Sequence, residues 1–175
     1  VRQRRHLPAP ATALVGRRDE IDELIAAFRG ATRLLTLTGA GGIGKTRLAL
    51  QVAHELAGAF ADGVWFVGLA PLADAAFVEA AVAEALELRD VSLEAHLSGR
   101  ELLLLLDNFE HVADAAPLVS RLLTAAPRLK VLATSRSRLD LYGALDYPVP
   151  PLQPAAATTL FLERARAARP GFATA

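Results

Sequence analysis

The eight residues from Gly39 to Thr46 read GAGGIGKT and match the pattern G-x-x-x-x-G-K-[ST]. Glycines let such a loop turn so that successive backbone N–H groups point at phosphate oxygens, and the helix that follows adds its positive end. In this pattern the lysine reaches the β- and γ-phosphates, and the Thr hydroxyl ligates Mg²⁺. The motif therefore predicts a phosphate loop with Lys45 as a catalytic residue, and nucleotide-binding residues Gly39, Ala40, Gly41, Gly42, Ile43, Gly44, Lys45 and Thr46. A glycine-rich turn that only caps a helix is the simpler alternative.

A run of five leucines, Leu102 to Leu106, ends abruptly at Asp107. A short apolar run suits a central parallel strand that is buried on both faces. An acid at the carboxyl end of such a strand would lie beside the phosphate loop and hold Mg²⁺ through water. We therefore predict Asp107 as a catalytic residue and, with Thr46, as a metal-binding residue. An ordinary acid that closes a strand at a turn is the alternative, and the phosphate loop upstream favours the functional interpretation.

A third polar strand end carries the sequence TSR, Thr134 to Arg136. In P-loop ATPases with an additional strand, that strand lies between the phosphate-loop strand and the strand that ends in the acid. Arg136 would then point at the γ-phosphate and contact it through a charge-assisted hydrogen bond. We predict Arg136 as the third catalytic residue, with a surface arginine in a loop as the alternative.

These residues require a sheet that brings several strand ends together, and the apolar patterns along the chain supply one. Short β-prone runs alternate with segments of helical periodicity, which is typical of an α/β fold with a largely parallel sheet. We expect a P-loop NTPase three-layer sandwich with a mainly parallel five-stranded sheet, in the order 5-1-4-3-2 along the sheet, and helices on both faces. The expected strands are 33–38, 63–69, 101–107, 130–135 and 146–152, and the expected helices are 16–30, 44–58, 74–88, 111–126 and 156–168.

The chain divides into three parts by composition. Residues 1–13 contain prolines and no periodicity, and we interpret them as a linker from an upstream domain; their arginines could alternatively form a nucleic-acid patch. Residues 14–152 form the nucleotide-binding P-loop domain. Residues 153–175 begin a further helical segment.

The bulk composition excludes several classes of protein. The 175 residues are 53% apolar and 22% charged, carry a formal net charge of zero, and include no cysteine. Disulfides and thiol catalysis are therefore excluded, and the domain has no overall electrostatic attraction to nucleic acid or an anionic membrane. The N-terminal residues form no signal peptide and the leucine run is too short to span a bilayer, so we expect a cytoplasmic protein without membrane contact.

Six sequence blocks in order resemble the nucleotide-binding domain of bacterial STAND ATPases of the NB-ARC type. The resemblance runs from about Leu14 to the end of the chain and points to transcriptional regulators of the AfsR/SARP and LuxR-like groups. The blocks are LVGRRDEIDEL, LLTLTGAGGIGKTRLAL, DGVWFVGLAPLAD, LLLLLDNFEHV, LKVLATSRSRL and YPVPPL.

The resemblance implies an ATP/ADP switch in a signalling or transcriptional protein, with ATP or ADP and Mg²⁺ as its ligands. It also implies that the helical segment 153–175 leads to a lid domain, which we expect to lie outside this sequence. Val15 and Arg17 would lie near the adenine, Arg47 would extend the phosphate loop, and Asp107 and Arg136 would be the Walker-B acid and the sensor arginine. The partners would be nucleotide and other domains of the same regulator, without direct nucleic-acid contact. We expect the isolated domain to be a monomer, and an ATP-dependent oligomer of the full-length protein stays an open alternative.

Asn108 departs from many relatives, which carry a second acid after the Walker-B residue. An amide cannot accept a proton as a carboxylate can, so we expect slow ATP hydrolysis. Glu110 and His111 could instead orient the attacking water, although both also suit the start of the next helix. An energy-coupling ATPase such as a remodelling motor is the main alternative function. A P-loop kinase or GTPase, and a scaffold that binds no nucleotide, are further alternatives.

Overall fold

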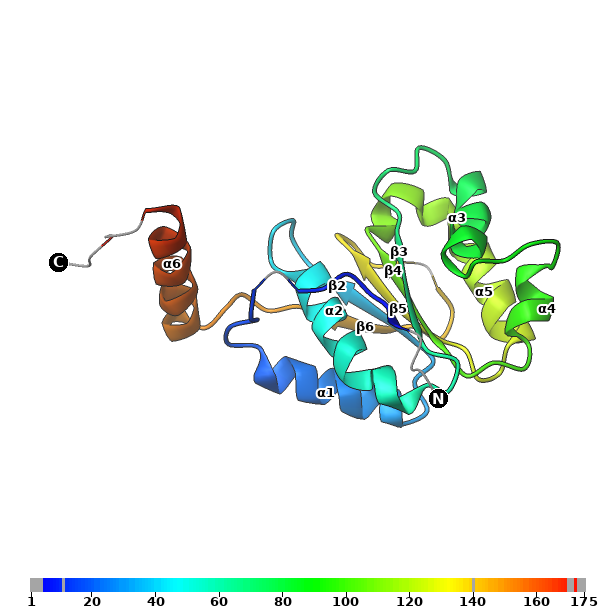
Figure 1. The fold of residues 1–175 in the computed structure, drawn as a ribbon, viewed down its shortest axis with the longest axis horizontal. Helices are drawn as coiled ribbons and strands as arrows, with labels where there is room; N and C mark the ends of the chain where they lie inside the picture. Colours follow the sequence, from blue (N-terminus) through cyan, green and yellow to red (C-terminus); the bar gives the residue numbers. More distant parts are fainter. Residues whose placement is uncertain (1–4, 11, 140, 170–171, 173–175) are drawn as a thin grey trace.

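The computed structural model describes residues 5–10, 12–139, 141–169 and 172, and in these it shows a parallel sheet between two layers of helices (Figure 1). Parts of the predicted linker (1–4 and 11) and of the predicted C-terminal segment (170–171 and 173–175) lie outside the described residues. The strand order is β1-β3-β4-β5-β2-β6, and every pair of neighbours is parallel. The strands are β1 (Arg5–His6), β2 (Leu34–Thr38), β3 (Val64–Gly68), β4 (Leu103–Asp107), β5 (Lys130–Ser135) and β6 (Leu145–Pro148).

The helices connect these strands and cover both faces of the sheet. In Figure 1, α1 and α2 lie together on one face, and α3, α4 and α5 lie on the other. The α-helices are α1 (Arg18–Arg29), α2 (Lys45–Leu56), α3 (Val78–Ala85), α4 (Leu93–Leu97), α5 (Ala116–Ala125) and α6 (Pro154–Ala168), and the 3-10 segments are η1 (Ala57–Ala59), η2 (Ala75–Phe77) and η3 (Phe109–Ala115).

The predicted fold class and strand order are confirmed. The five expected strands appear as β2, β3, β4, β5 and β6 in the predicted order. β6 is shorter than expected and ends at Pro148, since the following Pro150 and Pro151 have no N–H to donate to a neighbouring strand.

Three local features differ from the expectation. The helix predicted over 74–88 is η2 followed by α3, and the one predicted over 111–126 is η3 followed by α5, with non-helical backbone at Val112 (φ −135°). Pro117 sits in the first turn of α5, where a missing N–H is tolerated. The short helix α4 was not predicted; its N-cap is Ser92, whose hydroxyl accepts a hydrogen bond from the Ala95 N–H at 3.2 Å.

A further unpredicted strand lies within the segment expected to be a linker. Arg5 and His6 of β1 pair with Val64 and Trp65 of β3 and extend the sheet at that edge. The His6 ring stacks on the indole of Trp65 with ring centroids 3.9 Å apart. One aromatic contact and one strand pair leave no periodic signal in the sequence, so pattern analysis could not find them.

The leucine run serves both layers of the core because alternate residues of a strand face opposite sides of a sheet. Leu103 and Leu105 belong to the cluster beneath α1 and α2, whereas Leu104 and Leu106 belong to the cluster beneath α3, α4 and α5. All four are at most 1% exposed. A strand with apolar residues on both faces can only be central, and this places Asp107 at the end of a rigid element.

Candidate functional site

The phosphate loop lies between β2 and α2, at the carboxyl edge of the sheet. Gly44 precedes α2 with φ 100° and ψ 17°, a backbone conformation that side chains disfavour. Lys45 is 7% exposed, and its Nζ donates hydrogen bonds to the carbonyls of Gly39 (2.8 Å) and Ala40 (3.0 Å). The loop therefore folds around its own ammonium group, with the lysine side chain directed into its concave side.

Thr46 and Asp107 meet at the centre of the site. The Thr46 hydroxyl donates to Asp107 Oδ1 at 2.7 Å, although the two residues lie 61 positions apart in the sequence. The same oxygen accepts a second hydrogen bond, from the Thr134 hydroxyl at 2.6 Å. Asp107 is 6% exposed, so two hydroxyl groups fix the orientation of a buried carboxylate beside the phosphate loop.

Thr134 also determines the path of the chain after β4. Its Oγ1 accepts a hydrogen bond from the Asn108 N–H at 3.0 Å. Asn108 has left-handed backbone angles (φ 62°, ψ 44°), a conformation in which Asn is favoured over most other residues. The asparagine at this position therefore has a conformational reason, independent of any effect on hydrolysis.

Arg136 lies just beyond the end of β5 and pairs with Glu110. Its Nε lies 3.1 Å from Glu110 Oε1, and the arginine side chain is 64% exposed. Glu110 stands in the first turn of η3, as its sequence position suggested. Arg136 is thus an exposed residue of the loop after β5 that pairs with Glu110. Among the described residues it makes no hydrogen bond to Lys45, Thr46 or Asp107.

The segment before α1 contacts the phosphate loop through Arg17. This side chain is 4% exposed, pairs with Glu20 at 2.6 Å, and approaches the carbonyl of Ile43 at 3.4 Å. Nearby, burial raises the pKa of Tyr147, and the hydrogen bond that its hydroxyl donates to Glu23 (2.7 Å) raises it further. Through its contact with the Ile43 carbonyl, Arg17 therefore supports the backbone of the phosphate loop.

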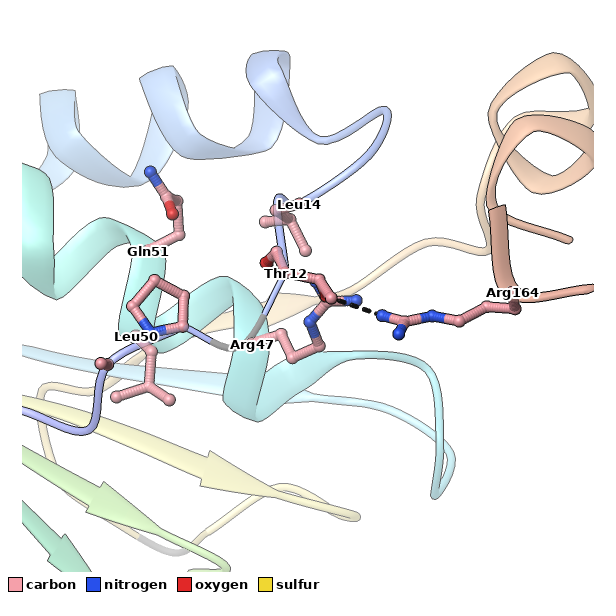
Figure 2. Close-up of a pocket in the computed structure, with 8 residues that line it drawn as sticks. Thr12, Leu14, Arg47, Leu50, Gln51 and Arg164 are labelled. Carbon is pink, nitrogen blue, oxygen red and sulfur yellow. Dashed lines mark hydrogen bonds between the residues drawn. The ribbon is translucent and has the colours of Figure 1, made fainter. Parts of the chain in front are cut away.

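Arg47 and Arg164 both bind Thr12, at the mouth of a pocket of about 280 Å³ (Figure 2). Arg47 donates to the Thr12 hydroxyl (2.9 Å) and to the carbonyls of Thr12 (3.0 Å) and Ala13 (2.8 Å). Arg164, from α6, donates to the same hydroxyl at 2.7 Å. Leu14 and Leu50 line the pocket's apolar wall.

Gly16 is a point of close approach between α6 and this segment. Its φ is +64°, and a Cβ atom added there would lie 2.2 Å from the Cβ of Ala156 in the first turn of α6. Val15, immediately before it, is half-buried. The segment that includes Val15 and Arg17 is therefore held between α2 and α6.

The structure brings together Lys45, Thr46 and Asp107, while Arg136 lies at the neighbouring strand end. Thr134, Thr12 and Arg164 were not singled out from the sequence. Thr134 could have been found from the predicted strand order, because the ends of neighbouring parallel strands lie side by side. In the structure Leu106 pairs with Ala133, so the next residues, Asp107 and Thr134, are neighbours. Thr12 and Arg164 carry no such signal, since their contact joins residues 152 positions apart.

Two general properties of the described residues bear on function. They contain no group of three or more His, Cys, Asp or Glu side chains arranged to hold a metal ion. None of the helices they form combines the length and apolar character that crossing a membrane requires.

Comparisons with known proteins agree with this geometry. Residues 13–173 match the family model described as AAA ATPase domain. Over 158 residues the chain is 42% identical to a protein of Mycobacterium tuberculosis (strain ATCC 25618 / H37Rv) named as an HTH-type transcriptional regulator, covering 85% of this chain and 18% of the relative. It is 32% identical over 185 residues to the regulatory protein AfsR of Streptomyces griseus, covering 94% of this chain and 19% of AfsR. The chain thus spans about a fifth of the length of these two relatives.

Solved structures show the same fold at low sequence identity. Cdc6p from Pyrobaculum aerophilum superposes with a TM-score of 0.66 at 17% identity, covering 91% of this chain and 52% of that one. The Aeropyrum pernix ORC2 protein superposes with a TM-score of 0.61 at 16% identity, covering 90% and 54%. The family match over nearly the whole chain, together with the phosphate loop and its buried acid, shows that this chain belongs to the AAA ATPase domain family.

Proposed function

We propose that this chain is an ATP/ADP-binding switch domain of a bacterial transcriptional or signal-transduction regulator, of the STAND NB-ARC type, with slow ATP hydrolysis. The observation that carries the proposal is the contact between the Thr46 hydroxyl and Asp107 Oδ1, at 2.7 Å, beside the buried Lys45. A family that hydrolyses ATP needs this triad of Lys45, Thr46 and Asp107 to bind the nucleotide phosphates and the metal ion. The regulatory role is supported by the names of the relatives.

Each residue of the triad has a role that follows from its chemistry. The Lys45 ammonium would exchange its carbonyl acceptors for the β- and γ-phosphate oxygens. Mg²⁺ prefers oxygen ligands such as hydroxyl and carboxylate groups. The Thr46 and Asp107 oxygens lie close enough together to hold one ion, Thr46 directly and Asp107 through water, so the site fits Mg²⁺. When bound, the ion neutralises charge on the phosphates. Thr134 keeps the carboxylate in position.

The rest of the nucleotide would extend from the phosphate loop toward the N-terminal segment. Arg47 follows the loop directly and borders the apolar pocket that Thr12 and Leu14 also line. A pocket of about 280 Å³ accommodates a purine base, and its position suits a base whose phosphates lie on the loop (Figure 2). Val15 and Arg17 would support the adenine side, and Arg136 would contact the γ-phosphate.

The proposed partners are nucleotide and other domains of the same regulator. The chain spans about a fifth of AfsR and of the mycobacterial relative, which leaves room for sensor and output domains around it. With a net charge of zero, this domain would not itself bind nucleic acid. The isolated domain would be a monomer.

Slow hydrolysis follows from the group that stands after Asp107. Asn108 can hold a water molecule by hydrogen bonds but cannot accept its proton. We expect a single-turnover rate on the order of 10⁻⁴ to 10⁻² s⁻¹, comparable to intrinsic regulatory GTPases rather than to kinases. Turnover near 1 s⁻¹ would contradict the switch.

The phosphate-loop assignment is tested by Lys45→Ala. This variant keeps the loop amides but loses the ammonium group, so titration calorimetry with Mg-ATP should show at least a tenfold loss of affinity, the scale of a charged hydrogen bond to phosphate. Lys130→Ala is the matched control, because Lys130 is the chain's other lysine and begins β5 at the far end of the sheet from the loop. Equal affinity of wild type and Lys45→Ala would refute the nucleotide site.

A further inference from the structure

The ion pair between Glu110 and Arg136 joins the two strand ends that border the proposed γ-phosphate position. Glu110 follows β4 by three residues, and Arg136 is the first residue after β5. The Asn108 N–H and the Thr134 hydroxyl connect the same two strand ends one step closer to Asp107. The pair therefore lies next to the Walker-B acid rather than on a remote surface.

The two partners of this pair differ sharply in burial. The Glu110 side chain is 12% exposed, whereas the Arg136 side chain is 64% exposed. Neither Glu110 carboxylate oxygen accepts a well-aligned hydrogen bond from the described residues, although both are inaccessible to water. Phe109, fully buried beside it, anchors the backbone of this turn. Glu110 is thus the fixed member of the pair and Arg136 the member that can leave.

A buried carboxylate without hydrogen bonds is stabilised chiefly by its single cationic partner. If Arg136 left, the Glu110 charge would be uncompensated. Arg136 therefore leaves Glu110 only when an anion of higher charge competes for its guanidinium group. A γ-phosphate is such an anion, and a nucleoside diphosphate lacks it. The same arginine therefore has two anionic partners, one supplied by the protein and one by the triphosphate.

We propose that Glu110 is a positioning residue that sets the preference of the domain between ATP and ADP by competing with the γ-phosphate for Arg136. ADP leaves the Glu110–Arg136 pair intact, whereas ATP must break it in order to gain the contact with Arg136. The pair thereby lowers the affinity for ATP relative to ADP. This inference rests on the proposed function, because it requires nucleotide to bind at the phosphate loop.

The test compares the affinities of ADP and of the β,γ-imido analogue of ATP, both with Mg²⁺, across a set of variants. Glu110→Gln keeps the shape of the side chain and removes its charge, so the ratio of ATP-analogue to ADP affinity should rise about three- to tenfold, the scale of a partly exposed charge-assisted contact. Arg136→Ala should lower the ratio. In the Arg136→Ala background, Glu110→Gln should change the ratio by less than twofold. Glu110→Ala, expected to act like Glu110→Gln, guards against a local effect of the amide.

The matched control is the ion pair between Arg138, on the same loop after β5, and Asp146, on β6. Arg138 Nε lies 3.2 Å from Asp146 Oδ2, with side-chain exposures of 82% and 20%, a similar asymmetry directed toward β6 instead of β4. Asp146→Asn should leave the ratio unchanged. A rise equal to that of Glu110→Gln would show a general effect of removing negative charge and would overturn the proposal.

Two other results would also overturn it. One is an unchanged ratio in Glu110→Gln while Arg136→Ala lowers it. The other is an unchanged ratio together with loss of single-turnover hydrolysis, which would make Glu110 the group that acts on water. Failure of the proposed function looks different: wild type and Lys45→Ala would then bind both nucleotides equally poorly or equally well.

Discussion

Thr134 is a single hydroxyl group that connects three parts of the site. It donates to Asp107 Oδ1 and accepts from the Asn108 N–H, and it is completely buried. A second buried threonine, on the neighbouring strand β2, provides a contrast. Thr36 is equally buried, but its hydroxyl has no hydrogen-bond partner among the described residues.

Thr134→Val should therefore destabilise the fold and disturb the metal site. Valine keeps the shape but leaves the partly buried Asn108 N–H without its hydrogen-bond acceptor, which costs about 1–3 kcal/mol in the free energy of unfolding. Asp107 also loses one of its two orienting hydroxyls, so a higher Mg²⁺ concentration should be needed for half-maximal nucleotide binding. Urea unfolding and Mg²⁺ titrations measure the two effects.

Thr36→Val, on the neighbouring strand β2, is the control. It removes an unsatisfied buried hydroxyl and should be neutral or stabilising, with an unchanged Mg²⁺ requirement. If both variants lost the same stability, the loss would come from the change to valine itself rather than from the hydrogen bonds of Thr134.

At the scale of elements, two cations tie helix ends to the sheet. Arg33, which precedes β2, donates to the carbonyls of Leu123 (2.5 Å) and Ala126 (2.7 Å) at the end of α5. Lys130, which begins β5, donates to the carbonyls of Phe28 and Gly30 at the end of α1. β2 and β5 are neighbours in the sheet. The cations at the starts of these two strands therefore cap two helices that lie on opposite faces of the sheet, α5 and α1.

Lys130→Ala should lower the free energy of unfolding by about 1 kcal/mol, because the last carbonyls of α1 lose a cation. Burial lowers the pKa of Lys130, and the nearby Arg33 lowers it further, which offsets part of this stabilisation. Arg29→Ala, an exposed cation in the same last turn, should change stability by a few tenths of a kcal/mol at most. Thermal unfolding of both variants decides whether the position of the cation matters.

Elements with long periodic patterns could be predicted from the sequence, and so could the residues at their ends. β4 and α2 were predicted because the leucine run and the spacing of Leu48 and Val52 are strong signals, and with them came the positions of Asp107 and Lys45. The five residues of α4 and the two of β1 are too short to show a period. The Glu110–Arg136 pair depends on the turn at Asn108, whose left-handed backbone no pattern specifies.

At the scale of the whole molecule, α6 stands apart from the three layers, joined to them by an extended segment (Figure 1). None of its residues is fully buried. Its described contacts with the N-terminal segment are the close approach of Ala156 to Gly16 and the hydrogen bond from Arg164 to Thr12. Its position therefore depends on a small number of atoms.

Gly16→Ala should displace α6. The substitution places a side chain in a left-handed conformation, which costs about 1–2 kcal/mol, and drives its Cβ into Ala156. Hydrogen exchange in α6 should become faster while exchange in β2 and β4 stays slow. Adding Ala156→Gly should restore slow exchange, since it removes the overlap; no rescue would mean that the backbone strain at residue 16 is the whole effect.

The sheet order also determines when the domain can fold during synthesis. β2 precedes the phosphate loop and pairs with β5 and β6. Leu34 therefore pairs with Val131, and Leu35 pairs with Leu145. Contacts between residues so far apart in the chain form late, because the intervening segment must first be made and ordered. The phosphate loop is thus translated early, and we expect a ribosome-bound chain to gain its nucleotide site only after β5 and β6, which flank the strand before the loop, have emerged.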